Sequence, residues 1–151
     1  KPGEAGLYAD ADGALDEAAR RGVANDRIAL WGTSLGAAVA AEMARRGRGA
    51  ALVLVSPFTS LPDVAARTAW WLPVSWLLPD RYDTLSKAGA IHVPTTVVHG
   101  DRDEVVPFFM GEALARAIPG ASFVRVPGAT HNDVYDVGGP TLMDSLVAAC
   151  R

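Results

Sequence analysis

The fold is decided by one stretch of the sequence, Ile28-Ala29-Leu30-Trp31-Gly32-Thr33-Ser34-Leu35-Gly36. Ile28 to Trp31 is a short apolar run without alternation, which is typical of a buried parallel strand. Gly32 to Gly36 matches the pattern G-x-S-x-G, and a helix is predicted directly after it, from about Leu35 to Arg46. The stretch therefore predicts a strand, a sharp turn and a helix, with Ser34 at the turn.

The predicted turn is the setting that a nucleophilic serine requires. A sharp strand-to-helix turn holds a serine in a strained backbone conformation with its hydroxyl above the sheet. Gly32 and Gly36 meet the need for small residues on either side of Ser34, where backbone and helix are expected to crowd the turn. The Leu35 N–H would then point to the place where an oxyanion forms. The competing interpretation is a tight glycine-rich turn with an incidental serine.

Three further short apolar runs alternate with helix-like segments along the chain. The predicted strands are Ala51 to Val55, Thr95 to His99 and Ser122 to Val126. The other predicted helices are Glu4 to Arg21, Pro107 to Ile118 with proline at the first helical position, and Thr141 to Ala149. This alternation predicts an α/β fold with a mostly parallel sheet of about four strands, flanked by helices and joined by right-handed crossovers.

Residues 58 to 93 interrupt this alternation because they contain no strand signal. We expect a cap-like insertion of short helices here. Phe58, Trp70, Trp71 and Trp76 are candidates for the wall of a substrate pocket that accepts an acyl group. Packing of the cap helices onto the body of the domain explains the tryptophans at least as well.

A serine hydroxyl needs a base to activate it and a third group to orient that base. Asp103 comes directly after the third predicted strand, and His131 comes directly after the fourth. With Ser34, all three residues follow the carboxyl ends of parallel strands, the edge where open α/β sheets bind ligands. Asp101 and Glu104 are the rivals of Asp103, and the plain interpretation of all three acids is a solvated turn.

A metal site is another interpretation of the same side chains. His99, Asp101, Asp103 and His131 could be drawn as ligands, but H-x-x-x-H and H-E-x-x-H spacings are absent. A metal site would also leave the turn at Ser34 unexplained. We therefore expect no metal and no cofactor, because an activated serine and a histidine suffice. His92 and His99 are expected to be structural.

The composition limits the other classes of function. The chain has 151 residues, of which 50% are hydrophobic and 21% charged, with a formal net charge of -3. This balance argues against disorder, and the lack of a basic face excludes nucleic acid as a partner. Cys150 is the only cysteine, which rules out an internal disulfide and a four-thiolate metal site. The longest apolar stretch, Ala69 to Pro79, is too short to span a bilayer, which needs roughly 20 residues.

The residues and their order resemble the α/β-hydrolase superfamily, in which the chain order is Ser, Asp, His. Two runs are similar to its serine hydrolase branch of protein depalmitoylases and monoacylglycerol-lipase-like or peptidase-like enzymes. They are Ser56-Pro57-Phe58-Thr59-Ser60 and His99-Gly100-Asp101-Arg102-Asp103-Glu104-Val105-Val106-Pro107. The resemblance covers nearly the whole chain. It implies that Ser34 is the nucleophile, Asp103 the acid and His131 the base.

The resemblance also implies that part of the domain is missing, because members carry several more strands before the first helix seen here. Residues 1 to 151 are therefore expected to be the carboxy-terminal part of a single domain, with its amino-terminal half absent. A cytoplasmic location is favoured, with room for a membrane anchor in the missing region. The run from Ile28 to Trp31 would then be an exposed sheet edge, which favours self-association.

The expected function is hydrolysis of an ester, thioester or amide in a small-molecule or acylated substrate, by acyl transfer through the three residues. The alternative is a non-catalytic fragment, or half of an assembly that needs its amino-terminal portion for activity.

Overall fold

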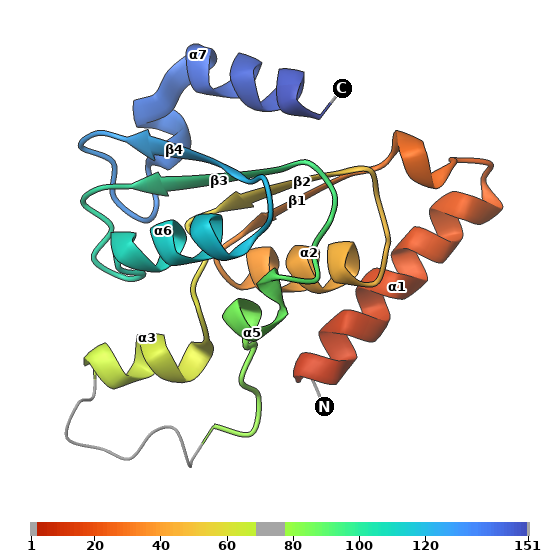
Figure 1. The fold of residues 1–151 in the computed structure, drawn as a ribbon, viewed down its shortest axis with the longest axis horizontal. Coiled ribbons are helices and arrows are strands. Elements are labelled where there is room, and N and C mark those ends of the chain that lie inside the picture. Colours follow the sequence, from red (N-terminus) through yellow and green to blue (C-terminus); the bar gives the residue numbers. More distant parts are fainter. Residues whose placement is uncertain (1–2, 69–77, 151) are drawn as a thin grey trace.

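The computed structural model describes residues 3–68 and 78–150 (Figure 1). In this part of the chain, four strands form one parallel sheet in the order β1-β2-β3-β4. The strands are β1 (Ala29–Thr33), β2 (Ala51–Val55), β3 (Thr95–Gly100) and β4 (Ser122–Val126). The helices are α1 (Glu4–Arg20), the 3-10 helix η1 (Asn25–Arg27), α2 (Leu35–Arg45), α3 (Leu61–Thr68), α5 (Thr84–Ala88), α6 (Phe108–Ala117) and α7 (Val134–Ala149). The predicted α/β class and parallel four-stranded sheet are confirmed.

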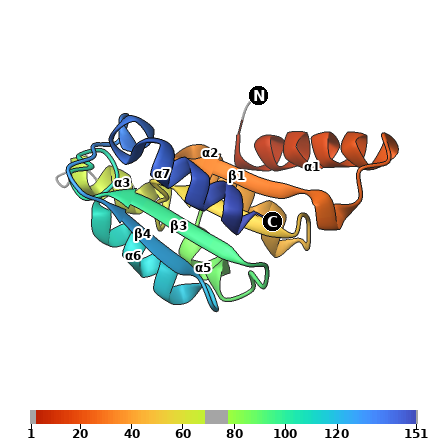
Figure 2. The same cartoon turned by 90° about the horizontal axis from the view of Figure 1, so that it is seen from above.

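Helices cover both faces of the sheet. Leu52 and Leu54 of β2 pack into a core with α2, α5 and α6, which lie below the sheet in Figure 1. Val53 and Val55 of the same strand pack on the opposite side with Leu146 of α7, which lies above it. Figure 2 shows α7 crossing over the strands, whereas α1 lies to the side and packs against α2. Alternate residues of β2 therefore serve two cores, as a parallel strand covered on both faces requires.

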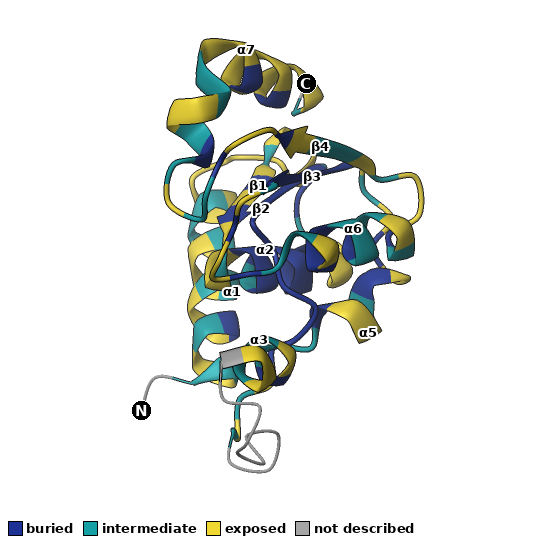
Figure 3. Ribbon diagram, turned by 90° about the vertical axis from the view of Figure 1, so that its left-hand side faces the viewer, coloured by how far each residue is buried: buried dark blue, intermediate teal, exposed yellow. Residues whose placement is uncertain are grey.

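Burial differs sharply between the inner and outer strands. All residues of β2 and β3 are buried, whereas β4 is largely exposed or half-buried, as Figure 3 shows. In β1, Leu30 and Gly32 are buried, but Ala29, Trp31 and Thr33 are exposed. Within the described residues β1 pairs only with β2. The strand before Ser34 is therefore an edge of the described sheet.

Several predicted helix boundaries differ from the structure, most of them by a single residue. α1 ends at Arg20, and Pro107 is the N-cap of α6 instead of its first residue. α7 begins at Val134, well before the predicted Thr141, but it is kinked at Gly139, where φ is 59° and ψ is -162°. The kink lies directly before Pro140. A proline interrupts the hydrogen-bond ladder of a helix, and this accounts for the kink. Only the segment after the kink corresponds to the helix that the sequence predicted.

The described residues of the cap-like segment 58–93 form the short helices α3 and α5 and no strand. Trp70, Trp71 and Trp76 lie outside the described residues, so their place in a substrate pocket stays a prediction. Of the helices in residues 3–68 and 78–150, none has the length and apolar character needed to cross a membrane.

A buried carboxylate on α2 joins three helices. Glu42 Oε1 accepts hydrogen bonds from Arg45 Nη2 and Arg46 Nε, and Oε2 accepts one from Arg45 Nε and lies 3.4 Å from the Lys87 ammonium of α5. Arg46 also pairs with Asp12 of α1. The hydrogen bond from Arg45 lowers the pKa of Glu42 to about 2; burial opposes this shift, while Arg46 and Lys87 add to it. The cluster fixes α1 and α5 against the helix that follows Ser34.

Candidate active site

Ser34 occupies the sharp turn between β1 and α2. Its φ of 53° and ψ of -117° lie in a region that L-residues rarely adopt, so the serine backbone is strained. Its N–H donates a 2.9 Å hydrogen bond to the carbonyl of Val55, which fixes the turn to β2. A Cβ at Gly32 would lie 2.2 Å from the Gly36 carbonyl oxygen and 2.7 Å from Ala37 Cα. Only glycine fits at position 32, because the helix backbone passes directly over it.

The expected crowding at Gly36 is wrong for this chain. A Cβ built there meets no atom within 4 Å. Gly36 borders an apolar groove of about 400 Å³ beside β1, which Leu30, Trp31 and Val39 also line. The space that would crowd a side chain at this position is therefore open.

The Leu35 backbone is placed as the sequence predicts for an oxyanion contact. Leu35 is the first residue of α2, and the N–H groups in the first turn of a helix have no acceptor inside that helix. This N–H is therefore available to a developing negative charge next to Ser34. Its role as oxyanion donor stays a prediction.

Asp103 and His131 are in direct contact. His131 Nδ1 lies 2.8 Å from Asp103 Oδ2, and the Asp103 side chain has no exposed surface. Asp103 Oδ1 accepts the N–H groups of Val105 at 3.0 Å and Val106 at 2.8 Å. Because an ionised carboxylate only accepts, His131 donates from Nδ1 and its Nε2 is left free to act as a base.

The charge of Asp103 is stabilised by its neighbours. Burial by itself raises the pKa of a carboxyl group, but hydrogen bonds from His99, His131 and the Val106 N–H outweigh it and lower the pKa of Asp103 to about 2. Asp103 is therefore ionised at neutral pH, as an orienting acid for His131 must be.

Among the described residues, neither Asp101 nor Glu104 forms a hydrogen bond or an ion pair with His131. Asp101 Oδ2 accepts hydrogen bonds from Arg125 Nε at 2.9 Å and Nη2 at 2.6 Å, and Oδ1 accepts the Gly128 N–H at 2.7 Å. The pKa of Asp101 is lowered, mainly by the hydrogen bonds from Arg125 and further by the one from the Gly128 N–H. Asp101 thus joins the loop after β3 to β4 and to the loop that leads to His131. Glu104 is exposed.

Ser34 and His131 are brought to the same edge of the sheet but are not hydrogen-bonded to each other among the described residues. The connection is indirect. Thr33 Oγ1 lies 2.9 Å from the hydroxyl of Tyr135, which follows His131 at the start of α7, and Trp31 Nε1 donates to the same hydroxyl at 2.9 Å. Catalytic hydrogen bonds are often long without substrate and shorten when it binds, and the role of His131 as the base stays a prediction.

An apolar pocket of about 320 Å³ adjoins Ser34. Its lining residues come from the turn, the cap-like segment and the loop after Asp103: Ser34, Leu35, Phe58, Leu61, Val64, Leu78, Pro79, Asp80, Tyr82, Val105 and Val106. Phe58 lines this pocket, and its contact with substrate stays a prediction. Apolar side chains form most of the wall, and Asp80 is the one carboxylate in this lining.

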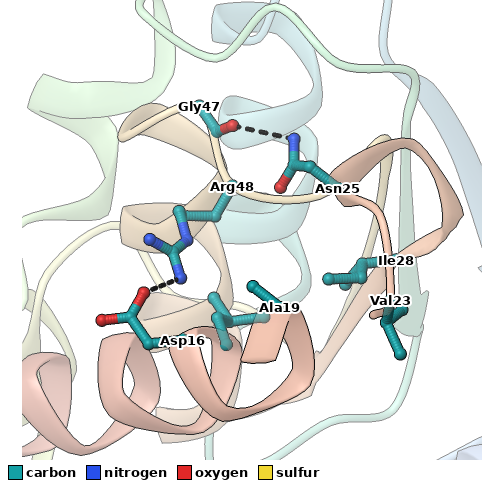
Figure 4. A pocket seen from close by; sticks show the side chains of 8 residues that line it. Asp16, Ala19, Val23, Asn25, Ile28, Gly47 and Arg48 are labelled. Atoms are coloured by element: carbon teal, nitrogen blue, oxygen red, sulfur yellow. Dashed lines mark hydrogen bonds and ion pairs between the residues drawn. The ribbon is translucent and has the colours of Figure 1, made fainter. Parts of the chain in front are cut away.

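A second cavity, of about 300 Å³, lies at the opposite edge of the sheet, near the starts of β1 and β2 (Figure 4). Its charged groups are already paired, since Arg48 Nη2 lies 2.5 Å from Asp16 Oδ1. Asn25 Nδ2 donates to the Gly47 carbonyl at 3.2 Å. In the described residues no group of three or more His, Cys, Asp or Glu side chains is placed to hold a metal ion. The candidate catalytic side chains therefore lie at the edge of the sheet that carries Ser34 and not at this cavity.

Sequence reasoning missed two residues near this edge. His99 was expected to be structural, but its Nε2 lies 3.3 Å from Asp103 Oδ2. The spacing of four residues at the end of a strand was a signal that could have suggested this contact. Tyr135 carried no local signal, because its partners Trp31 and Thr33 lie more than 100 residues away in the chain.

The chain has relatives with similar sequences, although no protein-family model matches it. An uncharacterized protein of Mycobacterium tuberculosis is 41% identical over 148 residues, which cover 97% of this chain and 53% of that protein. The human α/β hydrolase domain-containing protein 17C is 35% identical over 141 residues, covering 89% of this chain and 40% of that protein. The chain thus spans about half the length, or less, of these curated relatives.

The solved structures lead to the same fold. An α/β serine hydrolase homologue from Coxiella burnetii superposes with a TM-score of 0.72 at 25% identity, covering 100% of this chain and 62% of that one. Together with the strand–turn–helix at Ser34 and the relatives in sequence, this shows that the chain belongs to the α/β-hydrolase superfamily.

Proposed function

We propose that this chain carries the catalytic residues of a serine hydrolase that cleaves an ester, thioester or amide by acyl transfer. One observation carries the proposal: a strained serine turn and a buried Asp103 in contact with His131 lie at the same edge of one parallel sheet. Homology to α/β hydrolases supports hydrolysis as the class of reaction. Because the chain spans only part of its relatives, the activity belongs to the complete natural protein.

In the proposed mechanism, Ser34 Oγ attacks the substrate carbonyl while His131 Nε2 takes its proton. Asp103 holds the Nδ1–H tautomer of His131 and stabilises the imidazolium that forms. The Leu35 N–H stabilises the oxyanion. His131 then gives its proton to the leaving group, which departs and leaves Ser34 acylated. Water attacks the acyl-enzyme with His131 again as base, and releases the acid and free Ser34.

The pocket beside Ser34 supports an apolar acyl group as the part of the substrate that is bound. Leu61, Val64 and Phe58 present hydrocarbon surface next to the nucleophile. Burial of an alkyl chain against such a wall contributes about 0.8 kcal/mol per methylene group. The alternative is a chain that supplies no catalytic residue, and it differs from this proposal because the complete protein would then not react with a covalent probe at Ser34.

That reaction is the test. The complete natural protein is treated with a fluorophosphonate probe, and the labelled peptide is mapped. We expect labelling at Ser34, its loss in Ser34→Ala, and turnover of an ester reduced by about 10⁴-fold or more. Ser86→Ala, which changes an exposed serine on α5, is the control and should label normally. Labelling that survives Ser34→Ala, or none in the unmodified protein, would contradict the proposal.

A further inference from the structure

His99 is a second histidine at the Asp103 carboxylate. It lies in β3 and has no exposed surface. Its ring packs edge-on against Phe108, with centroids 5.8 Å apart. Phe108 is the first residue of α6, and a Cβ at Gly111 of the same helix would lie 2.3 Å from His99 Nδ1. The ring is therefore held between the sheet and α6, and the glycine at position 111 makes room for it.

The contacts of the His99 ring define its protonation. Nε2 lies 3.0 Å from the Val106 carbonyl oxygen, and that oxygen can only accept a hydrogen bond. Nε2 therefore carries a proton. Nδ1 is buried and has no hydrogen-bond partner among the described residues. A proton on Nδ1 would create a buried charge and a buried donor without an acceptor, both of which are costly. His99 is therefore the neutral Nε2–H tautomer.

The same ring nitrogen also lies close to the Asp103 carboxylate. Nε2 is 3.3 Å from Asp103 Oδ2, the oxygen that accepts His131 Nδ1 at 2.8 Å. The Val105 and Val106 N–H groups occupy the other oxygen. The backbone donors thus fix Oδ1, and among the described residues His99 and His131 are the side chains whose ring nitrogens lie close to Oδ2.

We infer that His99 is a positioning residue, which holds the Asp103 carboxylate in the rotamer that faces His131 by sharing its Nε2–H between Asp103 Oδ2 and the Val106 carbonyl. The inference rests on the proposed function, since it assigns His99 to the same site. His99 acts through Asp103 and touches no substrate. Being neutral, it donates to the carboxylate without placing a second positive charge beside the imidazolium that forms on His131.

Two substitutions of similar size separate donation from packing. The Gln side chain in His99→Gln keeps an N–H₂ donor near Asp103, whereas His99→Met fills the same space without one. We expect His99→Met to lower kcat about 10-fold or more with KM unchanged, because a hydrogen bond to a charged group is lost away from the substrate. His99→Gln should recover most of that loss. The assays use the complete natural protein and a p-nitrophenyl ester.

A double-mutant cycle shows whether His99 acts through Asp103. In an Asp103→Asn background, adding His99→Met should change kcat by less than about twofold, because the carboxylate to be positioned is gone. A merely structural role would lower kcat in both backgrounds. Equal loss in His99→Gln and His99→Met, no loss in His99→Met, or an undiminished loss in the Asp103→Asn background would each overturn the inference.

A further measurement needs no variant that must fold. Nitrogen-15 chemical shifts of the histidine rings at pH 7 should show a protonated Nε2 and an unprotonated Nδ1 for His99. A doubly protonated ring or an Nδ1–H tautomer would overturn the inference. Failure of the proposed function is recognised separately, as an unmodified protein in which Ser34 does not react with a fluorophosphonate. If Ser34 reacts and the His99 variants match the unmodified protein, only the role of His99 is wrong.

Discussion

Thr33 and Tyr135 are joined by a 2.9 Å hydrogen bond between their hydroxyl groups, although 102 residues separate them in the chain. Trp31 Nε1, which can only donate, contributes the second hydrogen bond to the same Tyr135 oxygen. The Tyr135 proton is therefore available to Thr33. This contact joins the end of β1, directly before Ser34, to the first turn of α7, directly after the loop that carries His131.

Tyr135→Phe should lower catalysis without unfolding the protein. The variant keeps the ring and loses both hydrogen bonds, so the His131 loop is less well fixed relative to Ser34. We expect kcat to fall about 3-fold to 10-fold, because small misplacements of a catalytic group are costly. Steady-state kinetics on the complete protein measure this, with Tyr8→Phe as the matched control, because that variant also loses two tyrosine hydrogen bonds, to Glu4 and Lys87, outside the pocket at Ser34. An unchanged kcat would show that the loop is held by other contacts.

The apolar pocket should select for long acyl chains. Val64→Glu places a carboxylate on the wall formed by α3. We expect KM for p-nitrophenyl octanoate to rise about 10-fold or more while KM for the acetate changes little, because only the longer chain reaches the charge on this wall. Leu85→Glu, at an exposed leucine on α5, is the control. Equal effects on both esters, or a native preference for acetyl, would argue against an acyl pocket here.

Glu42 should make stability depend on acid pH. Its pKa is lowered from 4.5 to about 2 in the folded protein. The stabilisation is therefore complete above about pH 5 and is lost as the pH falls through about 2, since the unfolded chain binds the proton first. Glu42→Gln should lower the unfolding free energy at pH 7 by about 2–3 kcal/mol and flatten its decline between pH 5 and 2.

Urea unfolding at pH 7, 5 and 3, followed by circular dichroism, measures this decline. Glu17→Gln is the control, since Glu17 also pairs with two arginines but at the surface of α1. Its effect should stay below about 1 kcal/mol. If the two variants lose the same free energy, burial is not what makes the Glu42 cluster stabilising.

We propose that β1, the edge strand of the described sheet, drives self-association of residues 1–151. A polypeptide of residues 1–151 exposes an unpaired strand edge beside the apolar groove at Gly36. We expect it to elute as an oligomer in size-exclusion chromatography and to hydrolyse esters far more slowly than the complete protein. Ala29→Lys, which adds a charge on this edge, should shift it toward the monomer. The control variant, Val147→Lys on the exposed face of α7, should leave the oligomer unchanged. The proposal would be refuted if residues 1–151 without substitution were a monomer as active as the complete protein.

Local patterns were sufficient for the elements of this fold. The run from Ala51 to Val55 is a strand with the predicted bounds, because an apolar β-branched run between turns favours few other structures. The helix after Ser34 begins at Leu35, as the turn required. The sequence did not predict the start of α7 at Val134, because Gly139 and Pro140 are residues that usually interrupt a helix. The crowding assigned to Gly36 failed because it depends on neighbours in space.

The sequence by itself determined which residues are candidates for chemistry. Ser34, Asp103 and His131 each follow a predicted strand, and parallel strands bring their carboxyl ends to one edge. The tertiary structure decided which acid meets His131: Asp103 contacts it, while Asp101 is held by Arg125. It also brought His99 to Asp103 and Tyr135 to Thr33. Such contacts depend on side-chain directions and loop paths, which are fixed only when the sheet and helices pack together. The spacing of four residues was a local signal for the His99–Asp103 contact, whereas no local pattern of residues encodes the contact of Tyr135 with Thr33 or of Asp101 with Arg125.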